Sequence, residues 1–132
     1  MSSAREKLDV PHFERVLRTR SSVLRAEIHE VLLRSDAEPY AKLAGEVHDL
    51  EEEALADLLV DLDLAEITRH IEELRDIDAA LRRIATQTYG ACLSCGQPIE
   101  PDRLEAYPTA KRCFTCQKSR EHLTMVPPTP TL

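Results

Sequence analysis

The sequence predicts a mainly α fold: an antiparallel helical hairpin of coiled-coil type, followed by a small cysteine-containing module that ends in a helix. Three observations support this class. The 132 residues include only three glycines, and an internal glycine costs a helix about 1 kcal/mol relative to alanine. Two Phe, three Tyr and no Trp leave few large side chains for a thick globular core. Apolar residues recur at intervals of three and four over two long stretches.

The first helix is expected to begin near Asp9, a suitable N-cap, with Pro11 in its first turn. Its apolar residues follow helical spacing: Phe13, Val16, Leu17, Leu24, Ile28, Val31 and Leu32. The segment 35–40 is expected to end this helix, because Pro39 would remove a hydrogen bond from its interior. A short helical stretch, AKLAGEV, is expected next, with Gly45 closing it.

The second helix is expected to run from about Leu50 to Thr86, roughly 55 Å at a rise of 1.5 Å per residue. Its apolar positions step like a coiled-coil seam: Val60, Leu64, Ile67, Ile71, Leu74, Ile77, Leu81 and Ile84. Two amphipathic helices joined by a turn predict an antiparallel hairpin with the stripes packed together. We expect this hairpin over residues 10–87, after a flexible N-terminus at 1–9.

An uncompensated run of acid lies at the expected turn of the hairpin. Nine carboxylates and no Lys or Arg occur from Glu46 to Glu66, although like charges three or four residues apart repel on a helix. The hairpin therefore predicts an acidic tip near residues 45–54. A helix N-terminus, where carboxylates favour the dipole, would account for the first acids of the run. It would not account for the later ones, which should pair with arginines of the first helix or face solvent: Asp57, Asp61 and Asp63.

All four cysteines lie in two Cys-x-x-Cys pairs separated by 17 residues: Cys92, Cys95, Cys113 and Cys116. Such spacing lets both sulfurs of a pair reach one metal, four thiolates suit tetrahedral zinc, and Gly96 permits the tight turn. The rival interpretations are disulfides, a redox pair or an iron–sulfur cluster; a cytoplasmic setting disfavours the first, and no βαβ pattern supports the second. We predict one structural Zn²⁺ in a four-cysteine zinc finger with a terminal helix over residues 88–123, followed by a disordered tail at 124–132.

Composition limits the function classes. The formal net charge is −7, and basic residues near the cysteines are offset by nearby acids, so we expect no sequence-specific DNA binding. No stretch is apolar enough for a signal peptide or a membrane span, so we expect a cytoplasmic protein without a membrane partner. The chain has no phosphate-binding glycine loop and no Ser-His-Asp arrangement, and its five histidines lack metal-ligand spacing. We expect no enzyme activity from it.

A resemblance to the DksA/TraR family of bacterial transcription regulators rests on the stretch YGACLSCGQPIEPDRLEAYPTAKRCFTCQ. The shared elements are Tyr89-Gly90, the cysteine spacing, Cys95-Gly96, Ile99, RLEAYPTA at 103–110, and Cys113 to Gln117. The hairpin ahead of it is similar as well, so the resemblance covers about residues 10–122. It implies a regulator that binds RNA polymerase through its secondary channel and modulates promoter complexes with an acidic coiled-coil tip, without reading DNA.

The resemblance also implies roles for individual residues. The family's tip pattern, Asp-x-x-Asp-x-Ala, falls on Asp49, Glu52 and Ala54 by its distance from the first zinc cysteine; Glu52 keeps the charge and adds one methylene. Arg69 matches a shaft arginine that the family uses against the polymerase rim, and an ion pair with Glu66 or Glu73 is the alternative. Two other functions stay open: a transcript-cleavage-type factor positioning Mg²⁺ in the polymerase, and a zinc-stabilised helical adaptor for another protein.

Family members that respond to guanosine tetraphosphate carry an arginine between the Ala and Pro of the RLEA-x-PTA segment. Here that position is Tyr107, and two further positions that are basic in those members hold Asp76 and Gln117. Phosphate groups are best matched by Arg or Lys. We therefore expect that this nucleotide is not bound at the family site, although basic residues in the same region offer a different one: Lys111, Arg112, Lys118 and Arg120.

Overall fold

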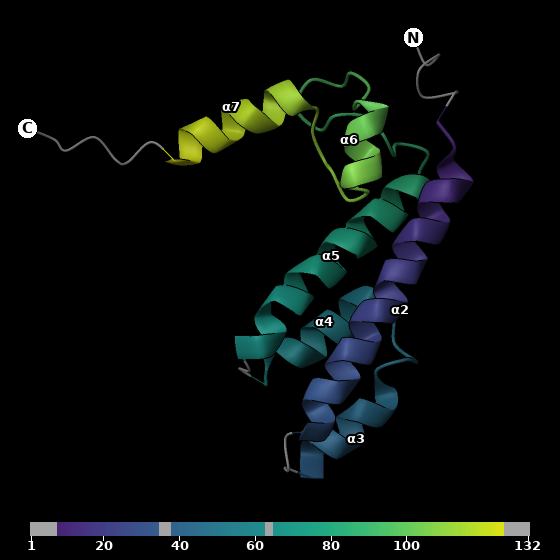
Figure 1. Ribbon diagram of the computed structural model, residues 1–132, viewed down its shortest axis with the longest axis vertical. Helices are drawn as coiled ribbons and strands as arrows, with labels where there is room; N and C mark the ends of the chain where they lie inside the picture. Colours follow the sequence, from purple (N-terminus) through teal and green to yellow (C-terminus); the bar gives the residue numbers. More distant parts are fainter. Residues whose placement is uncertain (1–7, 35–37, 63–64, 126–132) are drawn as a thin grey trace, which may run out of the picture.

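The computed structural model describes residues 8–34, 38–62 and 65–125. Their helices are α2 (Val10–Arg34), α3 (Glu38–Glu46), α4 (Glu52–Val60), α5 (Ala65–Ala85), α6 (Pro101–Ala106) and α7 (Phe114–Met125). In Figure 1, α2 and α5 run antiparallel side by side, α6 caps one end of the pair, and α7 points away from it. Strand pairing within the described ranges is limited to one isolated bridge, between Ala91 and Pro98. The mainly α class is confirmed.

Helix α2 forms as its sequence predicts. The backbone N–H of His12 donates to the Asp9 carboxylate at 3.1 Å, which satisfies one of the unpaired donors at the helix start. The helix ends at Arg34, ahead of the segment that contains Pro39. The predicted apolar positions of its inner face are buried, except that Val16 is half-buried.

The single helix expected over residues 50–86 is wrong, because it is divided in two. Helix α4 ends at Val60, a turn follows at Asp61–Leu62, and α5 begins at Ala65. Helix α4 packs back against α5 instead of extending it (Figure 1). As a result the predicted seam residue Val60 is 52% exposed. Leu64 lies outside the described residues.

The apolar core includes the short helices as well as the long ones. We call α2 to α5 the helical body. Ala44 and Val47, in and just after α3, and Leu55 and Leu59 of α4 are at most 1% exposed. Burying one large aliphatic side chain contributes about 1.5–3 kcal/mol, so α3 and α4 are integral parts of the body. They pack with the inner faces of the long helices: Leu17, Leu24, Ile28, Leu32, Ile67, Leu74 and Ile77.

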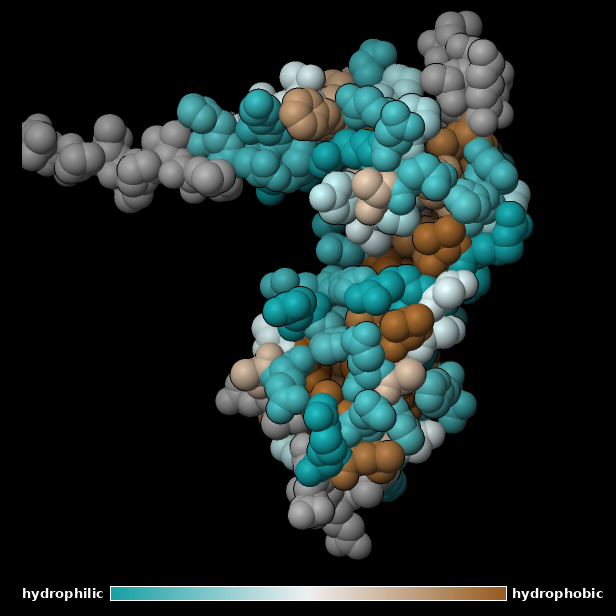
Figure 2. Space-filling model, in the orientation of Figure 1, coloured by the Kyte–Doolittle hydropathy of each residue, from teal (hydrophilic) through white to brown (hydrophobic). Residues whose placement is uncertain are grey.

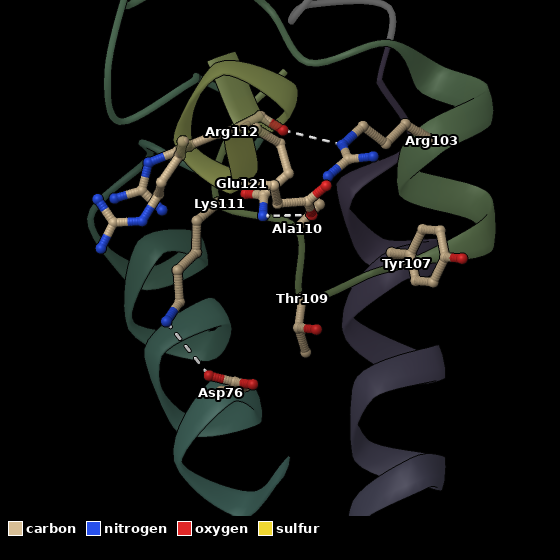
Figure 3. Close-up of a pocket in the computed structure, with 10 residues that line it drawn as sticks. Asp76, Arg103, Tyr107, Thr109, Ala110, Lys111, Arg112 and Glu121 are labelled. Carbon is tan, nitrogen blue, oxygen red and sulfur yellow. Dashed lines mark hydrogen bonds and ion pairs between the residues drawn. The ribbon is translucent and has the colours of Figure 1, made fainter. Parts of the chain in front are cut away.

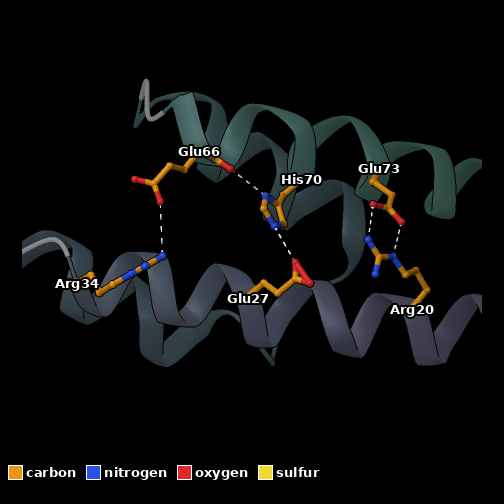
Figure 4. A network of polar contacts seen from close by, with 6 residues as sticks. All are labelled: Arg20, Glu27, Arg34, Glu66, His70 and Glu73. Atoms are coloured by element: carbon orange, nitrogen blue, oxygen red, sulfur yellow. Dashed lines mark hydrogen bonds and ion pairs between the residues drawn. The ribbon is translucent and has the colours of Figure 1, made fainter.

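Polar contacts join α2 to α5 along one exposed edge (Figure 4). An Nη atom of Arg20 donates to Glu73 at 2.9 Å, His70 Nε2 lies 3.1 Å from a Glu27 carboxylate oxygen, and Arg34 lies 3.5 Å from Glu66. The Arg20 hydrogen bond lowers the pKa of Glu73 below its ordinary value, in spite of the opposing effect of burial. Exposed ion pairs contribute about 0–1 kcal/mol each, so these contacts set the register of the pair more than its stability.

The surface on the face drawn in Figure 2 is mainly hydrophilic over α7, and apolar patches gather on the body. Among the described helices, none is both long and apolar enough to cross a bilayer. The predicted flexible N-terminus falls on residues 1–9, of which 1–7 lie outside the described residues. Residues 126–132 of the predicted tail lie outside them as well.

Candidate functional site

The four cysteines converge on one point in the module after α5. Their Sγ atoms all lie within 4.8 Å of one another, and those of Cys95 and Cys113 are 3.9 Å apart. A tetrahedral zinc ion with bonds of about 2.3 Å places its sulfur ligands about 3.8 Å from each other. The chain therefore gathers four sulfurs at close to the separations that one Zn²⁺ requires.

Tight turns hold the first pair of cysteines in place. The Gly96 N–H donates to the Cys92 carbonyl oxygen at 2.9 Å, and the Cys92 N–H donates to the Gln97 carbonyl oxygen at 2.8 Å. Gly96 adopts a φ of +76°, which glycine reaches without steric cost. The two pairs are joined by a hydrogen bond of 2.9 Å from the Leu93 N–H to the Lys111 carbonyl oxygen.

The electrostatics of the cluster favour a cation at its centre. Burial disfavours the thiolate of Cys92, but backbone N–H groups of Cys95, Cys113 and Ser94 donate to its sulfur and lower its pKa to about 6. Cys116 is surrounded by the other thiols, which raise its pKa to about 12. Because like charges this close oppose each other's ionisation, four thiolates need a divalent ion between them. Metal binding should then release protons.

The second pair of cysteines lies at the start of α7. The backbone N–H of Phe114 donates to the Glu100 carboxylate at 3.1 Å, so a side chain from the segment before α6 caps α7. Hydrogen bonds from its own backbone N–H and from that of Phe114 lower the pKa of Glu100. The helix expected after Cys113 is present as α7.

The cysteine module is fixed to the body around Tyr89. This side chain is 2% exposed, its hydroxyl donates to the Pro108 carbonyl oxygen at 2.7 Å, and its ring centroid lies 5.7 Å from that of Phe13. Burial raises the pKa of Tyr89 to about 12. Next to it, Gly90 has a φ of +89°, and a Cβ there would come within 2.8 Å of the Leu8 side chain. A larger residue at position 90 would therefore strain the backbone and require the Leu8 side chain to move.

Residues 45–54, predicted to be an acidic tip and hereafter called the acidic segment, lie within the helical body, from the end of α3 to the first turn of α4. The connection from α3 to α4 runs along α2 (Figure 1), and Val47, within it, is fully buried. Asp49 and Ala54 are exposed, whereas Glu52 is half-buried at the first turn of α4. This placement differs from the projecting tip that a straight hairpin would produce, because α4 folds back on α5.

Glu52 is held by two residues of α2, and we call this set of contacts the Arg25 clamp. The Ser21 hydroxyl donates to Glu52 Oε2 at 2.8 Å, and Arg25 Nη2 lies 3.2 Å from the same oxygen. Arg25 Nη1 also donates to the carbonyl oxygens of Val47, at 2.7 Å, and Leu50. Burial by itself raises the pKa of Glu52, but the hydrogen bonds from Ser21, its own backbone N–H and Arg25 lower it below the ordinary value.

The other acids of the run have different partners from those expected. Asp57 lies 3.0 Å from Arg75 of α5, and Glu53 lies 3.7 Å from the same arginine, so these pairs form within the α4–α5 unit. Asp57 was expected to pair with arginines of the first helix or to face solvent. Its side chain is 63% exposed, and its partner lies on α5 because α4 packs on α5. Asp61 is exposed, and Asp63 lies outside the described residues.

Comparisons with known proteins decide the family. A family model described as the prokaryotic dksA/traR C4-type zinc finger matches residues 87–122. The RNA polymerase-binding transcription factor DksA of Caulobacter vibrioides is 35% identical over 95 residues, which cover 70% of this chain and 67% of that relative. The chain belongs to the DksA/TraR family. Its C4-type finger and its four clustered cysteines identify the cofactor as one structural Zn²⁺.

Further similarity to DksA/TraR family members extends through the helical body. The RNA polymerase-binding transcription factor DksA of Escherichia coli K12 is 29% identical over 110 residues, 83% of this chain and 70% of the relative. The solution structure of the DnaK suppressor protein from Agrobacterium tumefaciens C58 aligns with a TM-score of 0.57 at 32% identity, covering 86% of this chain and 95% of that one. Transcription factor DksA2 from Pseudomonas aeruginosa aligns with a TM-score of 0.56 at 30% identity, covering 87% and 84%.

Two further positions implied by the DksA/TraR resemblance lie on α5. Arg69 is exposed, and among the described residues it forms no ion pair. Its expected partners contact other arginines, Glu66 with Arg34 and Glu73 with Arg20. Asp76 is engaged by Lys111 at 3.2 Å at the edge of a cavity of about 490 Å³ under the finger (Figure 3).

Proposed function

We propose that this chain regulates transcription by binding RNA polymerase through its secondary channel and modulating promoter complexes with its acidic segment. The observation that supports this most strongly is the extent of the family similarity. Relatives named RNA polymerase-binding transcription factors align over 83% of the chain, far beyond the finger at residues 87–122. The helical body, which carries the acidic segment, is therefore part of what is shared.

Each region has a distinct role in the proposal. Zinc holds the finger rigid, and Tyr89 fixes the finger to the body. Asp49, Glu52 and Ala54 act near the catalytic centre of the polymerase, and exposed Arg69 contacts its rim. The chain reads no DNA sequence and catalyses no reaction itself, in keeping with relatives that are named transcription factors.

The direct test is capture of RNA polymerase by the purified chain, combined with a promoter-complex assay. Asp49→Asn and Glu52→Gln, made singly and together, should keep most of the binding and lose most of the effect on promoter complexes. A control for the loss of two charges changes exposed acids of the body outside the acidic segment, Asp61→Asn with Glu72→Gln, whereas Glu52 itself is half-buried. If the acidic-segment variants and the control variant have the same effect on promoter complexes, the acidic segment has no special role in transcription.

The two other functions have their own discriminating results. Stimulated cleavage of backtracked RNA in the presence of Mg²⁺ would select the transcript-cleavage function, since two or more carboxylates can bind that ion. Failure to capture polymerase would select a zinc-stabilised adaptor for another partner.

The cavity under the finger lies where the family's site for guanosine tetraphosphate is expected. It is lined by Tyr107, which is 62% exposed and uncharged, and by Asp76, which already neutralises Lys111 (Figure 3). Gln117 donates to Glu121 at 2.9 Å, which places a second carboxylate in the same cavity. At Tyr107, Asp76 and Gln117 the cavity lacks the positive charges that suit phosphate groups, so we propose that guanosine tetraphosphate does not bind there appreciably. The basic residues Arg103, Arg112 and Arg120 also line this cavity.

The nucleotide proposal is tested by titrating guanosine tetraphosphate into a transcription assay that contains this chain. The polymerase in that assay should have its factor-independent nucleotide site disabled. The expected result is no appreciable gain in the effect of the chain. A severalfold, saturable gain would contradict the proposal, and a variant with Asp76→Lys and Tyr107→Arg is the positive comparison.

A further inference from the structure

The Arg25 clamp binds the acidic segment at three points. Two carbonyl oxygens of the α3–α4 connection, those of Val47 and Leu50, accept hydrogen bonds from the guanidinium, and the Glu52 carboxylate completes the set. Arg25 Nε donates to the Ser21 hydroxyl at 3.0 Å, so the two residues that hold Glu52 also hold each other. The clamp is therefore one connected network spanning α2, the connection and α4.

The clamp is largely removed from water. The side chain of Arg25 is 10% exposed and that of Glu52 is 13% exposed. A partly buried charge is stable only with its partners in place, because neither ion recovers full hydration while the surrounding core stays closed. Glu52 Oε2 already accepts hydrogen bonds from both Ser21 and Arg25. In this arrangement the Glu52 carboxylate is committed to α2 and is not available to a partner protein.

Apolar packing of α4, the helix that begins at Glu52, supports the same arrangement. Leu55 and Leu59, one and two turns further along α4, are 0% and 1% exposed in the core. The packed backbone of α4 therefore keeps Glu52 next to Ser21 and Arg25. Asp49 is exposed, so the two acids of the tip pattern, Asp49 and Glu52, differ in accessibility.

We propose that this structure is a closed form, in which the Arg25 clamp withholds Glu52 from the polymerase, and that the clamp must be released before the acidic segment acts. The inference rests on the proposed function. A polymerase that engages Glu52 can shift the chain to an open form only by its higher affinity for that form. The apparent affinity is then reduced by the small fraction of open chain, so a weakened clamp should increase potency.

Two clamp variants and one matched control test this inference. Ser21→Ala removes one hydrogen bond to Glu52, and Arg25→Gln removes the cation; circular dichroism confirms that each variant is folded. Arg20→Gln is the control, because it breaks an ion pair of the same helix with Glu73 and contacts no part of the acidic segment. Ser21→Ala keeps the test informative if Arg25→Gln fails to fold.

The first measurement is amide hydrogen exchange of the full chain without polymerase. Exchange over residues 44–60 should become about tenfold or more faster in the clamp variants, as expected for loss of a hydrogen bond to a charged group, and stay unchanged over residues 65–85. The second is the concentration that gives half of the maximal effect on promoter complexes, which should fall severalfold. The control should match the unmodified chain in both measurements.

The outcomes separate this inference from the proposed function. Unchanged exchange in folded clamp variants would overturn the inference, since the clamp would not then hold the segment. Faster exchange with unchanged or reduced potency, in a chain that does bind polymerase, would overturn the inference alone. If the unmodified chain does not bind polymerase, the proposed function fails and the inference fails with it.

Discussion

The helical body and the zinc finger are held together by different forces. The body buries apolar side chains along four helices, whereas the described part of the finger contributes four residues to the buried apolar set, one of them a metal ligand: Tyr89, Cys92, Ile99 and Leu104. A module this small has too little apolar burial to fold by that means alone. The two regions are therefore stabilised differently: the finger depends on zinc, and the body depends on apolar burial.

The largest effect should follow removal of the metal. Zinc binding by four thiolates supplies about 10 kcal/mol or more of apparent free energy in small fingers. Chelation, or Cys95→Ser, should therefore unfold residues 88–123 and leave the body largely helical by circular dichroism. Elemental analysis under reducing conditions should give one zinc per chain. A metal-free preparation with an ordered finger would contradict this division between the two regions.

A core truncation in the body should be next in size. Leu59→Ala removes a side chain that is 1% exposed in α4, and such truncations cost about 2–5 kcal/mol of unfolding free energy. Its neighbour Leu58 is 41% exposed, so Leu58→Ala should change stability by about 0.5 kcal/mol or less. Denaturant unfolding measures both, and the zinc content should stay at one per chain. Equal costs at the two positions would show that α4 does not pack as described.

The joint between the two regions should respond more weakly. Tyr89→Phe keeps the ring against Phe13 and removes the hydroxyl that donates to Pro108, at a cost of about 1 kcal/mol. The partly buried carbonyl oxygen then loses its partner, but the cysteine cluster is untouched. We expect a small loss of stability with full zinc occupancy, measured by denaturant unfolding and elemental analysis. Tyr107→Phe, at an exposed ring, is the control and should have no effect.

The smallest effect expected is a response of the body to mild acid. The folded-state pKa values of Glu52 and Glu73 lie below the ordinary value of 4.5 because both carboxylates accept hydrogen bonds. The unfolded chain therefore binds protons at these two carboxylates more readily than the folded chain does. The stability that the carboxylates contribute is fully present at a pH above their ordinary pKa, and it is lost as the pH falls through their lower folded-state pKa values. Urea unfolding at about pH 6 and about pH 4 should show this loss, and Glu73→Gln should reduce the difference. A body that gained stability in acid would contradict the assignment.

The finger could be predicted from the sequence because its determinants are local. Each Cys-x-x-Cys pair specifies two ligands three residues apart, Gly96 specifies a tight turn directly after the first pair, and the predicted helix after Cys113 appears as α7. The capping of α7 by Glu100 was not predicted, since that contact joins residues 14 apart and has no motif.

The arrangement of the body could be predicted only in part. Helical periodicity identified the buried face of α2 correctly, but it continues through Val60 and beyond, where the chain turns back. Apolar residues at intervals of three and four predict which face of a helix is buried, but they do not predict which other helix packs against that face. The signal that was missed is Arg25, a charged residue beside Leu24 on the buried face of α2, where it is 8% exposed. A buried arginine requires a partner, and its partner Glu52 is distant in sequence.

The burial of Tyr89 also gives the chain a built-in optical reporter. The protein has no tryptophan and only three tyrosines; Tyr107 is exposed and Tyr40 half-buried, while Tyr89 alone of the three is fully enclosed, against Phe13. An aromatic ring held in a fixed asymmetric environment dominates the near-ultraviolet circular dichroism of such a protein. The attachment of finger to body can therefore be followed spectroscopically in the unlabelled chain, without touching the cysteines that hold zinc.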